Sequence, residues 1–357
     1  MKLFTPGPVA MDPQTIAEAG KQPQYFRTPE FSKILGECSQ MLKTALDAPD
    51  SAKMIFLTAS GTAAMEATVL NLFSGHDKII IINGGSFGKR FKQICDIHRL
   101  NSVSINLEWN EPFAPDCLAN YQNAGFTGML VNMCETSTGQ IYPMEIIADF
   151  CKKNNICLVV DAISSFLCDP LSMKSLGAGA VIVSSQKGLG LQPGMSFVAL
   201  TEEMYRERCE KNEVKSLYFC FTDYAKDLVR GQTPYTPAVS IINQLYAKLP
   251  GLVGKGMEAH ITYISKIATH LRERLAKTAQ FTVPSYPLSN CLTPVYCGKN
   301  NAMEIVETLK RQHDVYVTPC AGSIASFLFR VAHMSRQITE EDIDVLAELL
   351  QCYEQVV

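Results

Sequence analysis

The chain has 357 residues, of which 47% are hydrophobic and 19% are charged, and its net charge is −3 at neutral pH. This composition is typical of a folded globular protein long enough for one large and one smaller domain. The slightly acidic balance offers no basic surface for nucleic acid or an anionic membrane, and no apolar run is long enough to span a bilayer. No signal-peptide pattern opens the chain, so we expect a cytoplasmic protein.

The 13 cysteines are scattered and form no Cys-x-x-Cys pair. Several of them, such as Cys134, Cys157 and Cys168, lie in apolar segments, where free cysteine behaves as a small hydrophobic residue. We therefore expect neither a disulfide framework nor a metal site, and a reducing compartment fits this pattern.

The first half of the chain alternates short apolar runs with helical segments. Residues 1–15 lack periodicity and are typical of an extended arm, whereas residues 29–46 predict an amphipathic helix. The alternation that follows predicts βαβ units and a mostly parallel sheet. Its expected strands lie at residues 54–58, 78–82, within 99–111, and at 128–133, 156–161, 180–183 and 196–200.

The first of these strands leads into Ala59-Ser-Gly-Thr62 and a strong helix-forming segment. A helix N-terminus offers unpaired N–H groups and partial positive charge, glycine permits close approach, and hydroxyl groups add donors. Ser60, Gly61 and Thr62 are therefore a candidate phosphate site. The alternative is that Ser60 or Thr62 only caps the helix.

Two other predicted strands are followed by ionisable residues that could be catalytic. Asp161 follows an apolar strand, at the position where open α/β sheets bind ligands. Lys187 follows another strand inside a glycine-rich loop, and burial can turn a lysine into an amine nucleophile. Pyridoxal phosphate (PLP) enzymes need such a pair, because a lysine forms the Schiff base and an acid keeps the pyridine nitrogen protonated. The alternatives are a surface lysine and a helix-capping aspartate.

The segment 202–215 predicts a charge-rich helix. From about residue 250 onward, the alternation of short strands and helices becomes typical of an α+β domain. Arg330 lies on an apolar strand, where a guanidinium needs a partner. The partner is either a carboxylate that the planar guanidinium binds bidentately, or an acidic side chain in a structural salt bridge. The expected helices are 261–277, 302–312 and 340–353, and the expected strands are 281–283, 292–296, 315–318 and 326–330.

The sequence resembles the class V aminotransferases of PLP fold type I. The matching segments follow the family's order nearly from end to end, which makes the combination specific although each segment alone is weak. They are Phe4-Thr-Pro-Gly-Pro8, Tyr25-Phe-Arg-Thr-Pro-Glu-Phe31, Thr58-Ala-Ser-Gly-Thr62, Asn83-Gly-Gly-Ser-Phe-Gly88, Glu135-Thr-Ser-Thr-Gly139, Val160-Asp161, Ser185-Gln-Lys187, Gly231-Gln-Thr-Pro-Tyr-Thr-Pro237 and Phe329-Arg-Val-Ala-His-Met334.

The resemblance implies an α/β fold, with a large domain of helices around a mostly parallel mixed sheet and a smaller C-terminal α+β domain. The expected divisions are an arm at 1–15, a large PLP-binding domain at 16–245 and a small domain at 246–357. The implied activity moves an amino group from a small donor, such as alanine, serine or 2-aminoethylphosphonate, to pyruvate or glyoxylate. The implied assembly is a homodimer with shared active sites.

The resemblance also implies residue roles. Lys187 would form the aldimine with PLP and move the substrate proton, and Asp161 would protonate the pyridine nitrogen. Arg330, with Gly7 nearby, would bind the substrate carboxylate. The remaining cofactor contacts would be Phe87 stacked on the ring, Thr138 on the ring oxygen, and Ser60, Gly61, Thr62, Gln186 and Thr236 of the partner subunit on the phosphate.

Two departures from the family pattern bear on the substrate. Arg330-Val-Ala332 replaces the usual Arg-Ile-Gly, and Ser335 replaces a frequent glycine, so the pocket is expected to be narrower or to accept a different donor. A PLP-dependent lyase or desulfurase and a non-catalytic PLP-fold protein stay open as alternatives. Cys320 invites the desulfurase comparison, but Ser-Gln before Lys187, rather than histidine, argues against it. Candidates for gripping a phosphonate donor are Arg27, Lys89, Arg90 and Arg230.

Overall fold

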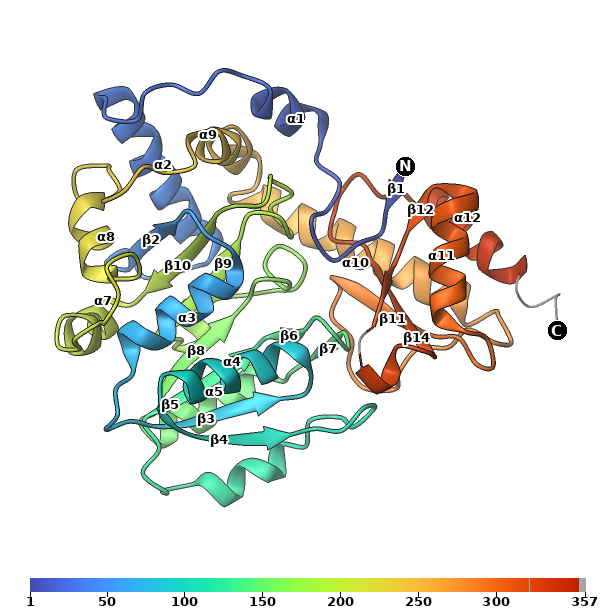
Figure 1. Cartoon of the computed structure of the whole chain (residues 1–357), viewed down its shortest axis with the longest axis horizontal. Helices are drawn as coiled ribbons and strands as arrows, with labels where there is room; N and C mark the ends of the chain where they lie inside the picture. Colours follow the sequence, from blue (N-terminus) through green and yellow to red (C-terminus); the bar gives the residue numbers. More distant parts are fainter. Residues whose placement is uncertain (321, 353–357) are drawn as a thin grey trace.

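The computed structural model describes residues 1–320 and 322–352, and its largest feature is a seven-stranded sheet (Figure 1). The strand order is β2-β10-β9-β8-β5-β3-β4; β10 is antiparallel to both of its neighbours, and the other pairs are parallel. This confirms the predicted mixed, mostly parallel sheet. The strands are β2 (Lys53–Leu57), β3 (Lys78–Asn83), β4 (Asn101–Asn106), β5 (Gly128–Asn132), β8 (Cys157–Asp161), β9 (Ala180–Ser184) and β10 (Ser196–Leu200).

Helices cover both faces of this sheet. Because strand side chains alternate, Ile80 and Ile82 of β3 lie in one core while Ile79 and Ile81 lie in the other, and a continuous apolar run buries both faces. The first core is covered by α2 (Pro29–Ala45), α5 (Met144–Lys153), α6 (Met173–Leu176) and α9 (Val239–Lys248). The second is covered by α3 (Gly61–Leu72), α4 (Ser86–Ile97) and α8 (Phe221–Leu228).

A smaller part holds the last third of the chain and, unexpectedly, its first residues. β1 (Lys2–Leu3) pairs in parallel with β12 (Val315–Tyr316), and Phe4 is buried in the core of this part. Figure 1 shows the blue N-terminal segment passing from β1, beside the red elements, across to α1 (Pro13–Ala19). The other elements are β11 (Leu292–Tyr296), β13 (Thr318–Pro319), β14 (Leu328–Ala332), α10 (Lys255–Leu275), α11 (Ala302–His313) and α12 (Glu340–Gln351).

The structure differs from the sequence-based expectations in a few elements. The helix expected at 202–215 ends at Cys209, as α7 (Glu202–Met204) followed by the short π-helix η2 (Tyr205–Cys209). The strand expected at 281–283 is reduced to a bridge between Thr282 and Tyr296. The short elements are the hairpin β6 (Cys134–Glu135) and β7 (Gln140–Ile141) with the 3-10 turns η1 (Pro115–Tyr121), η3 (Leu249–Gly251) and η4 (Gly322–Ile324).

The predicted boundary at residue 245 falls inside α9. The apolar residues of α9 pack against the large sheet, whereas those of α10 pack in the core of the smaller part. The domain limits themselves stay a prediction. Within the described residues, no helix combines the length and apolarity needed to cross a membrane.

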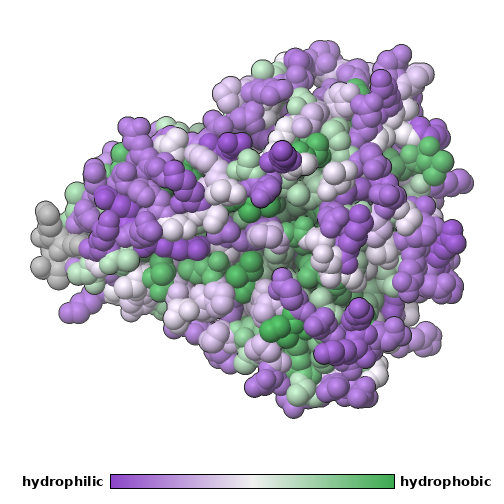
Figure 2. Space-filling view, turned by 180° about the vertical axis from the view of Figure 1, so that it is seen from behind, coloured by the Kyte–Doolittle hydropathy of each residue, from purple (hydrophilic) through white to green (hydrophobic). Residues whose placement is uncertain are grey.

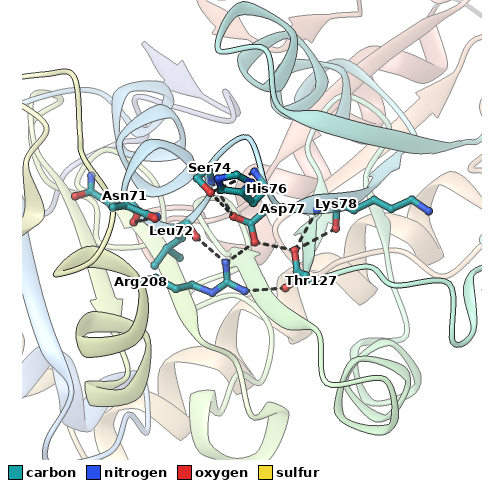
Figure 3. Close-up of polar contacts among 9 residues, drawn as sticks. Asn71, Leu72, Ser74, His76, Asp77, Lys78, Thr127 and Arg208 are labelled. Carbon is teal, nitrogen blue, oxygen red and sulfur yellow. Dashed lines mark hydrogen bonds and ion pairs between the residues drawn. The ribbon is translucent and has the colours of Figure 1, made fainter.

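The face of the molecule shown in Figure 2 is mainly hydrophilic, with hydrophobic residues in a discontinuous band across its middle. A polar network surrounds Asp77, which directly precedes β3 (Figure 3). Its carboxylate accepts hydrogen bonds from Ser74 N–H at 2.8 Å, Thr127 Oγ1 at 2.7 Å and Arg208 Nη1 at 2.9 Å. Burial alone would raise the pKa of Asp77, but these bonds together hold it below its ordinary value.

We expect Arg208→Met to lower the free energy of unfolding by about 2–3 kcal/mol, because Asp77 then stays partly buried without its cation. The matched control is Lys211→Met, which removes an exposed ion pair with Glu207 next to the same turn and should change stability by less than about 1 kcal/mol. Urea unfolding followed by circular dichroism measures both. Equal effects of the two changes would contradict the role of the Asp77 network.

Candidate active site

The residues predicted to bind PLP gather at the carboxyl ends of neighbouring strands. Asp161 is the last residue of β8, and Lys187 follows β9 by three residues. The N-terminus of α3 follows β2, and Phe87 follows β3 in the first turn of α4. Because the carboxyl ends of parallel strands meet at one edge, these residues lie at the edge where open α/β sheets bind their ligands.

Lys187 lies beneath the N-terminal arm. Its Nζ donates a hydrogen bond to the Pro6 carbonyl oxygen, and burial lowers the pKa of its amine. Gly7 has a φ of +133°, and a Cβ at this position would lie 2.9 Å from Lys187 Cδ and 3.0 Å from Nζ. Only glycine permits this path, so the arm places Gly7 directly against the lysine.

Two hydrogen bonds hold the buried carboxylate of Asp161 in one orientation. Its Oδ2 accepts a hydrogen bond from Asn132 Nδ2 at 2.5 Å, and its Oδ1 accepts one from the Ile163 N–H at 2.8 Å. Burial raises the pKa of this carboxyl to about 6. Asn132, the last residue of β5, was not singled out from the sequence; its place beside Asp161 follows from the pairing of β5 with β8.

The N-terminus of α3 lies against the same turn. Ser60 caps the helix, since its Oγ accepts a hydrogen bond from the Ala63 N–H at 3.4 Å. A Cβ at Gly61 would lie 2.6 Å from Cδ1 of Ile163, two residues after Asp161. The close contact at Gly61 brings the predicted phosphate-binding end of α3 next to the predicted partner of the pyridine nitrogen.

Glu135 fixes the position of Phe87, a role that the sequence did not reveal. This fully buried carboxylate accepts hydrogen bonds from the N–H groups of Phe87 at 3.1 Å, Gly88 at 2.9 Å and Ser137 at 3.0 Å. Gly85, the N-cap residue of α4, has no side chain to satisfy these donors. Glu135 therefore anchors the first turn of α4, and the half-buried Phe87 with it.

Thr138 and Thr136 lie differently in the β6–β7 hairpin. The Thr138 hydroxyl donates to the Glu135 carbonyl oxygen at 3.4 Å, within the turn. The Thr136 hydroxyl donates to Ser164 Oγ at 2.8 Å, three residues after Asp161. The role of Thr138 on the cofactor ring stays a prediction, and its neighbour Thr136 is a second candidate that the sequence did not single out.

The other predicted contacts lie in two loops. Gln186 is half-buried, and its main-chain carbonyl oxygen accepts a hydrogen bond from the Val9 N–H of the arm at 3.3 Å. Thr236 is exposed in the loop 231–237, which is held by bonds from Arg27 to Gln232 and to the Thr233 carbonyl oxygen, each at 3.0 Å. Its contact with a second subunit stays a prediction.

Arg330, on β14, points its guanidinium at main-chain oxygens. Nη1 donates to the Thr136 carbonyl oxygen at 3.0 Å, and Nη2 donates to the Pro319 carbonyl oxygen at 2.9 Å. Its Nε is buried without a hydrogen-bond partner, and within residues 1–320 and 322–352 it forms no ion pair with a carboxylate. Among the described residues, Arg330 therefore does not form the structural salt bridge that was the alternative to substrate binding.

Comparison with known proteins agrees with this geometry. The aminotransferase class-V family pattern matches residues 16–346. The chain belongs to the class-V aminotransferases. The predicted family, enzyme class and cofactor are thereby confirmed: the protein is an aminotransferase that uses PLP.

Several known proteins are similar over most of the chain. A protein named soluble hydrogenase 42 kDa subunit, from Anabaena cylindrica, is 27% identical over 98% of this chain and 92% of its own length. A serine–glyoxylate aminotransferase from Hyphomicrobium methylovorum is 28% identical over 76% of this chain and 68% of its own length. The crystal structure of an alanine–glyoxylate aminotransferase from Nostoc sp. superposes with a TM-score of 0.91 at 22% identity, covering 99% of this chain and 95% of that one. The structural likeness confirms the predicted fold.

The residues at this edge of the sheet suit PLP. A buried carboxyl whose pKa is raised by burial gains from a neighbouring pyridinium, and an amine whose pKa is lowered by burial is a nucleophile for an aldehyde. The α3 N-terminus offers N–H groups and the Ser60 and Thr62 hydroxyls to a phosphate. These three features lie at the same edge of the sheet, as PLP binding requires.

We expect the protein alone to bind PLP more weakly as pH falls through about 6, because Asp161 becomes protonated and loses its ion pair with the pyridinium. One pH unit below this pKa, the weakening from Asp161 is about tenfold. Titrating PLP into the cofactor-free protein between pH 5 and 8, followed by absorbance, measures it. Because PLP titrates too, Asp161→Asn is the reference; an identical pH dependence in both proteins would contradict this role.

Proposed function

We propose that this class-V aminotransferase moves an amino group from a small amino acid, such as alanine or serine, to a small keto acid such as glyoxylate or pyruvate. The observation that carries this proposal is the Arg330 guanidinium, which has no carboxylate partner in the described part of the chain and an unbonded Nε. A planar cation with open donors suits the α-carboxylate of such substrates.

In this proposal the chain's own residues divide the work. Bound PLP supplies the electron sink that acidifies the substrate Cα–H bond. Lys187 Nζ holds the cofactor and then moves the proton at that Cα, for which an amine of lowered pKa is suited. Asp161 keeps the pyridine nitrogen protonated, and Arg330 orients the carboxylate. Phe87 covers the ring, while Ser60, Gly61, Thr62 and Gln186 hold the phosphate.

The surroundings of the four cations considered for a phosphonate favour carboxylate donors. Arg27 is bonded to Gln232 and to main-chain oxygens, and Arg230 pairs with Asp227. Lys89 is exposed, and Arg90 is bonded to Thr62 at the predicted phosphate site of the cofactor. The names of the Hyphomicrobium and Nostoc proteins, with serine or alanine as donor and glyoxylate as acceptor, support the same choice.

We also propose a homodimer in which Thr236 reaches the phosphate bound by the partner subunit. Three exposed apolar side chains surround the loop 231–237: Tyr25 at 68%, Leu217 at 78% and Val229 at 88% exposure. Tyr25 precedes the Arg27 anchor of this loop by two residues, and the Leu217 carbonyl oxygen accepts a hydrogen bond from Tyr235. Apolar groups gathered in this way favour burial against another molecule.

We expect alanine or serine, but not 2-aminoethylphosphonate, to convert the bound cofactor to its pyridoxamine form, and glyoxylate or pyruvate to reverse the change. Absorbance spectra of the purified holoenzyme report both steps. Lys187→Ala should abolish turnover and covalent attachment of PLP on borohydride reduction. Conversion by 2-aminoethylphosphonate alone would overturn the donor assignment, and normal turnover by Lys187→Ala would overturn the site.

Arg330→Lys should raise KM for the keto acid by about 10–100-fold, because a point charge replaces a bidentate pair. PLP affinity serves as the internal control and should stay the same, since Arg330 is not assigned to the cofactor. Steady-state kinetics and a PLP titration measure the two quantities. An unchanged KM would show that another residue binds the carboxylate.

Val229→Asp should shift the protein from dimer to monomer, since it puts a charge into the proposed interface. Ile97→Asp is the control, because Ile97 is also exposed, at 71%, but lies at the far end of α4. Sedimentation velocity measures the mass of each variant. A dimer that withstands Val229→Asp, or a wild-type monomer, would contradict the proposed interface.

A further inference from the structure

Arg90 touches two residues that the proposed function assigns to opposite ends of PLP. Its guanidinium carbon lies 4.6 Å from the centroid of the Phe87 ring, and its Nη1 donates a hydrogen bond to Thr62 Oγ1 at 3.0 Å. Phe87 and Arg90 are three residues apart on α4 and so share one face of that helix. Thr62 lies in the first turn of α3. Arg90 thus bridges the starts of the two helices.

The β6–β7 hairpin fixes the first turn of α4, and with it the position of Arg90. Glu135 accepts hydrogen bonds from the Phe87 and Gly88 N–H groups, and Ser137 Oγ accepts one from the Ser86 N–H at 2.9 Å. With three consecutive N–H groups bound, the first turn of α4 has little freedom. Arg90 follows within one turn, so the bridge to Thr62 starts from a rigid base.

The positive charge of Arg90 is not neutralised by an acidic side chain of the described residues. In the part of the chain that the structure describes, it makes no ion pair, and its side chain is half-buried. Lys92, two residues later on the same helix, differs because it pairs with Asp96. A guanidinium without a carboxylate, next to a helix N-terminus, adds positive charge where an anionic group is expected.

We infer that Arg90 is a positioning residue for PLP that joins the ring-stacking Phe87 to the phosphate-binding Thr62. An aromatic ring has two faces, and a guanidinium over one of them holds the ring while the other face stays available for stacking. A hydroxyl that accepts a hydrogen bond from Arg90 keeps its own O–H for donation, so Thr62 is set to donate to a phosphate oxygen. This inference rests on the proposed roles of Phe87 and Thr62.

Lysine at position 90 would not replace arginine in both contacts. The guanidinium is planar and extended, so its carbon lies 4.6 Å from the centre of the Phe87 ring while its Nη1 donates to Thr62. An ammonium group is a compact point charge and would keep at most the attraction to one of the two. Arg90→Lys should therefore restore only part of what Arg90→Met removes.

The test measures dissociation constants of PLP and of pyridoxal, which lacks the phosphate, for the wild type, Arg90→Met, Arg90→Lys and the control Lys89→Met. For Arg90→Met we expect about tenfold weaker binding of PLP, a smaller loss for pyridoxal, and a reduced visible circular dichroism band of the bound cofactor. Lys89→Met, at the exposed neighbouring position, should match the wild type. Unchanged PLP affinity and dichroism in Arg90→Met would overturn the inference.

Double-mutant cycles separate positioning from a general loss of structure. If Arg90 acts through its two neighbours, its effect on PLP affinity should shrink in a Phe87→Leu background and also in a Thr62→Ala background. Full additivity in both backgrounds would overturn the inference. A further requirement is that the cofactor-free Arg90→Met protein melts within a few degrees of the wild type, because a large drop would assign the effect to folding instead.

The outcomes also distinguish this inference from the proposed function. If the wild type binds no PLP, the proposed function fails at once. If the wild type binds PLP and transaminates alanine or serine while Arg90→Met does so with unchanged cofactor affinity and spectrum, only the role of Arg90 fails. The proposed donor and acceptor are unaffected by that result.

Discussion

Burial of two ionisable groups at neighbouring strand ends is the constraint around which the rest of the structure is arranged. Asp161 ends β8 and Lys187 follows β9, and these two strands pair in parallel. Burial raises the pKa of the Asp161 carboxyl and lowers the pKa of the Lys187 amine, so both move toward neutral pH. Such burial is costly unless hydrogen bonds and charges compensate for it. Part of that compensation comes from Asn132, the Ile163 N–H and the Pro6 carbonyl oxygen. In the proposed function, bound PLP would add a pyridinium for Asp161 and an aldehyde for the Lys187 amine.

The large sheet could be predicted from the sequence because its strands are buried on both faces. Each then appears as a short apolar run, and the helices between them reveal the parallel connections. The pairing of β1 with β12 could not be predicted in this way. Both strands have two residues, too few for any periodicity, and the contact joins residues more than 300 positions apart. The early end of the helix after Glu202 was missed because its charged pattern continues beyond Cys209.

The site divides along the same line. Asp161, Lys187 and Ser60 could be placed from the sequence because each ends a recognisable strand or follows one by three residues. Glu135, Asn132 and Arg90 could not, because their roles depend on side chains brought close by folding and not on neighbours in the sequence. Glu135 shows this most clearly, since its carboxylate serves the N-terminus of a helix that begins 49 residues earlier, at Ser86. A single sequence gives no signal for such a distant cap.

The N-terminal arm has a mechanical consequence. Phe4 is fixed to the smaller part by two main-chain hydrogen bonds, from its N–H to Tyr316 and from the Ala332 N–H to its carbonyl oxygen. Pro6, which holds the amine of Lys187 through its carbonyl oxygen, comes only two residues later, a length of chain that spans at most about 7 Å. The attachment of the arm to the smaller part and its contact with Lys187 are therefore separated by a very short length of chain. A movement of the smaller part against the large sheet that exceeds this reach would break the hydrogen bond between the Pro6 carbonyl oxygen and the lysine amine, so the arm couples the position of one part to the amine in the other.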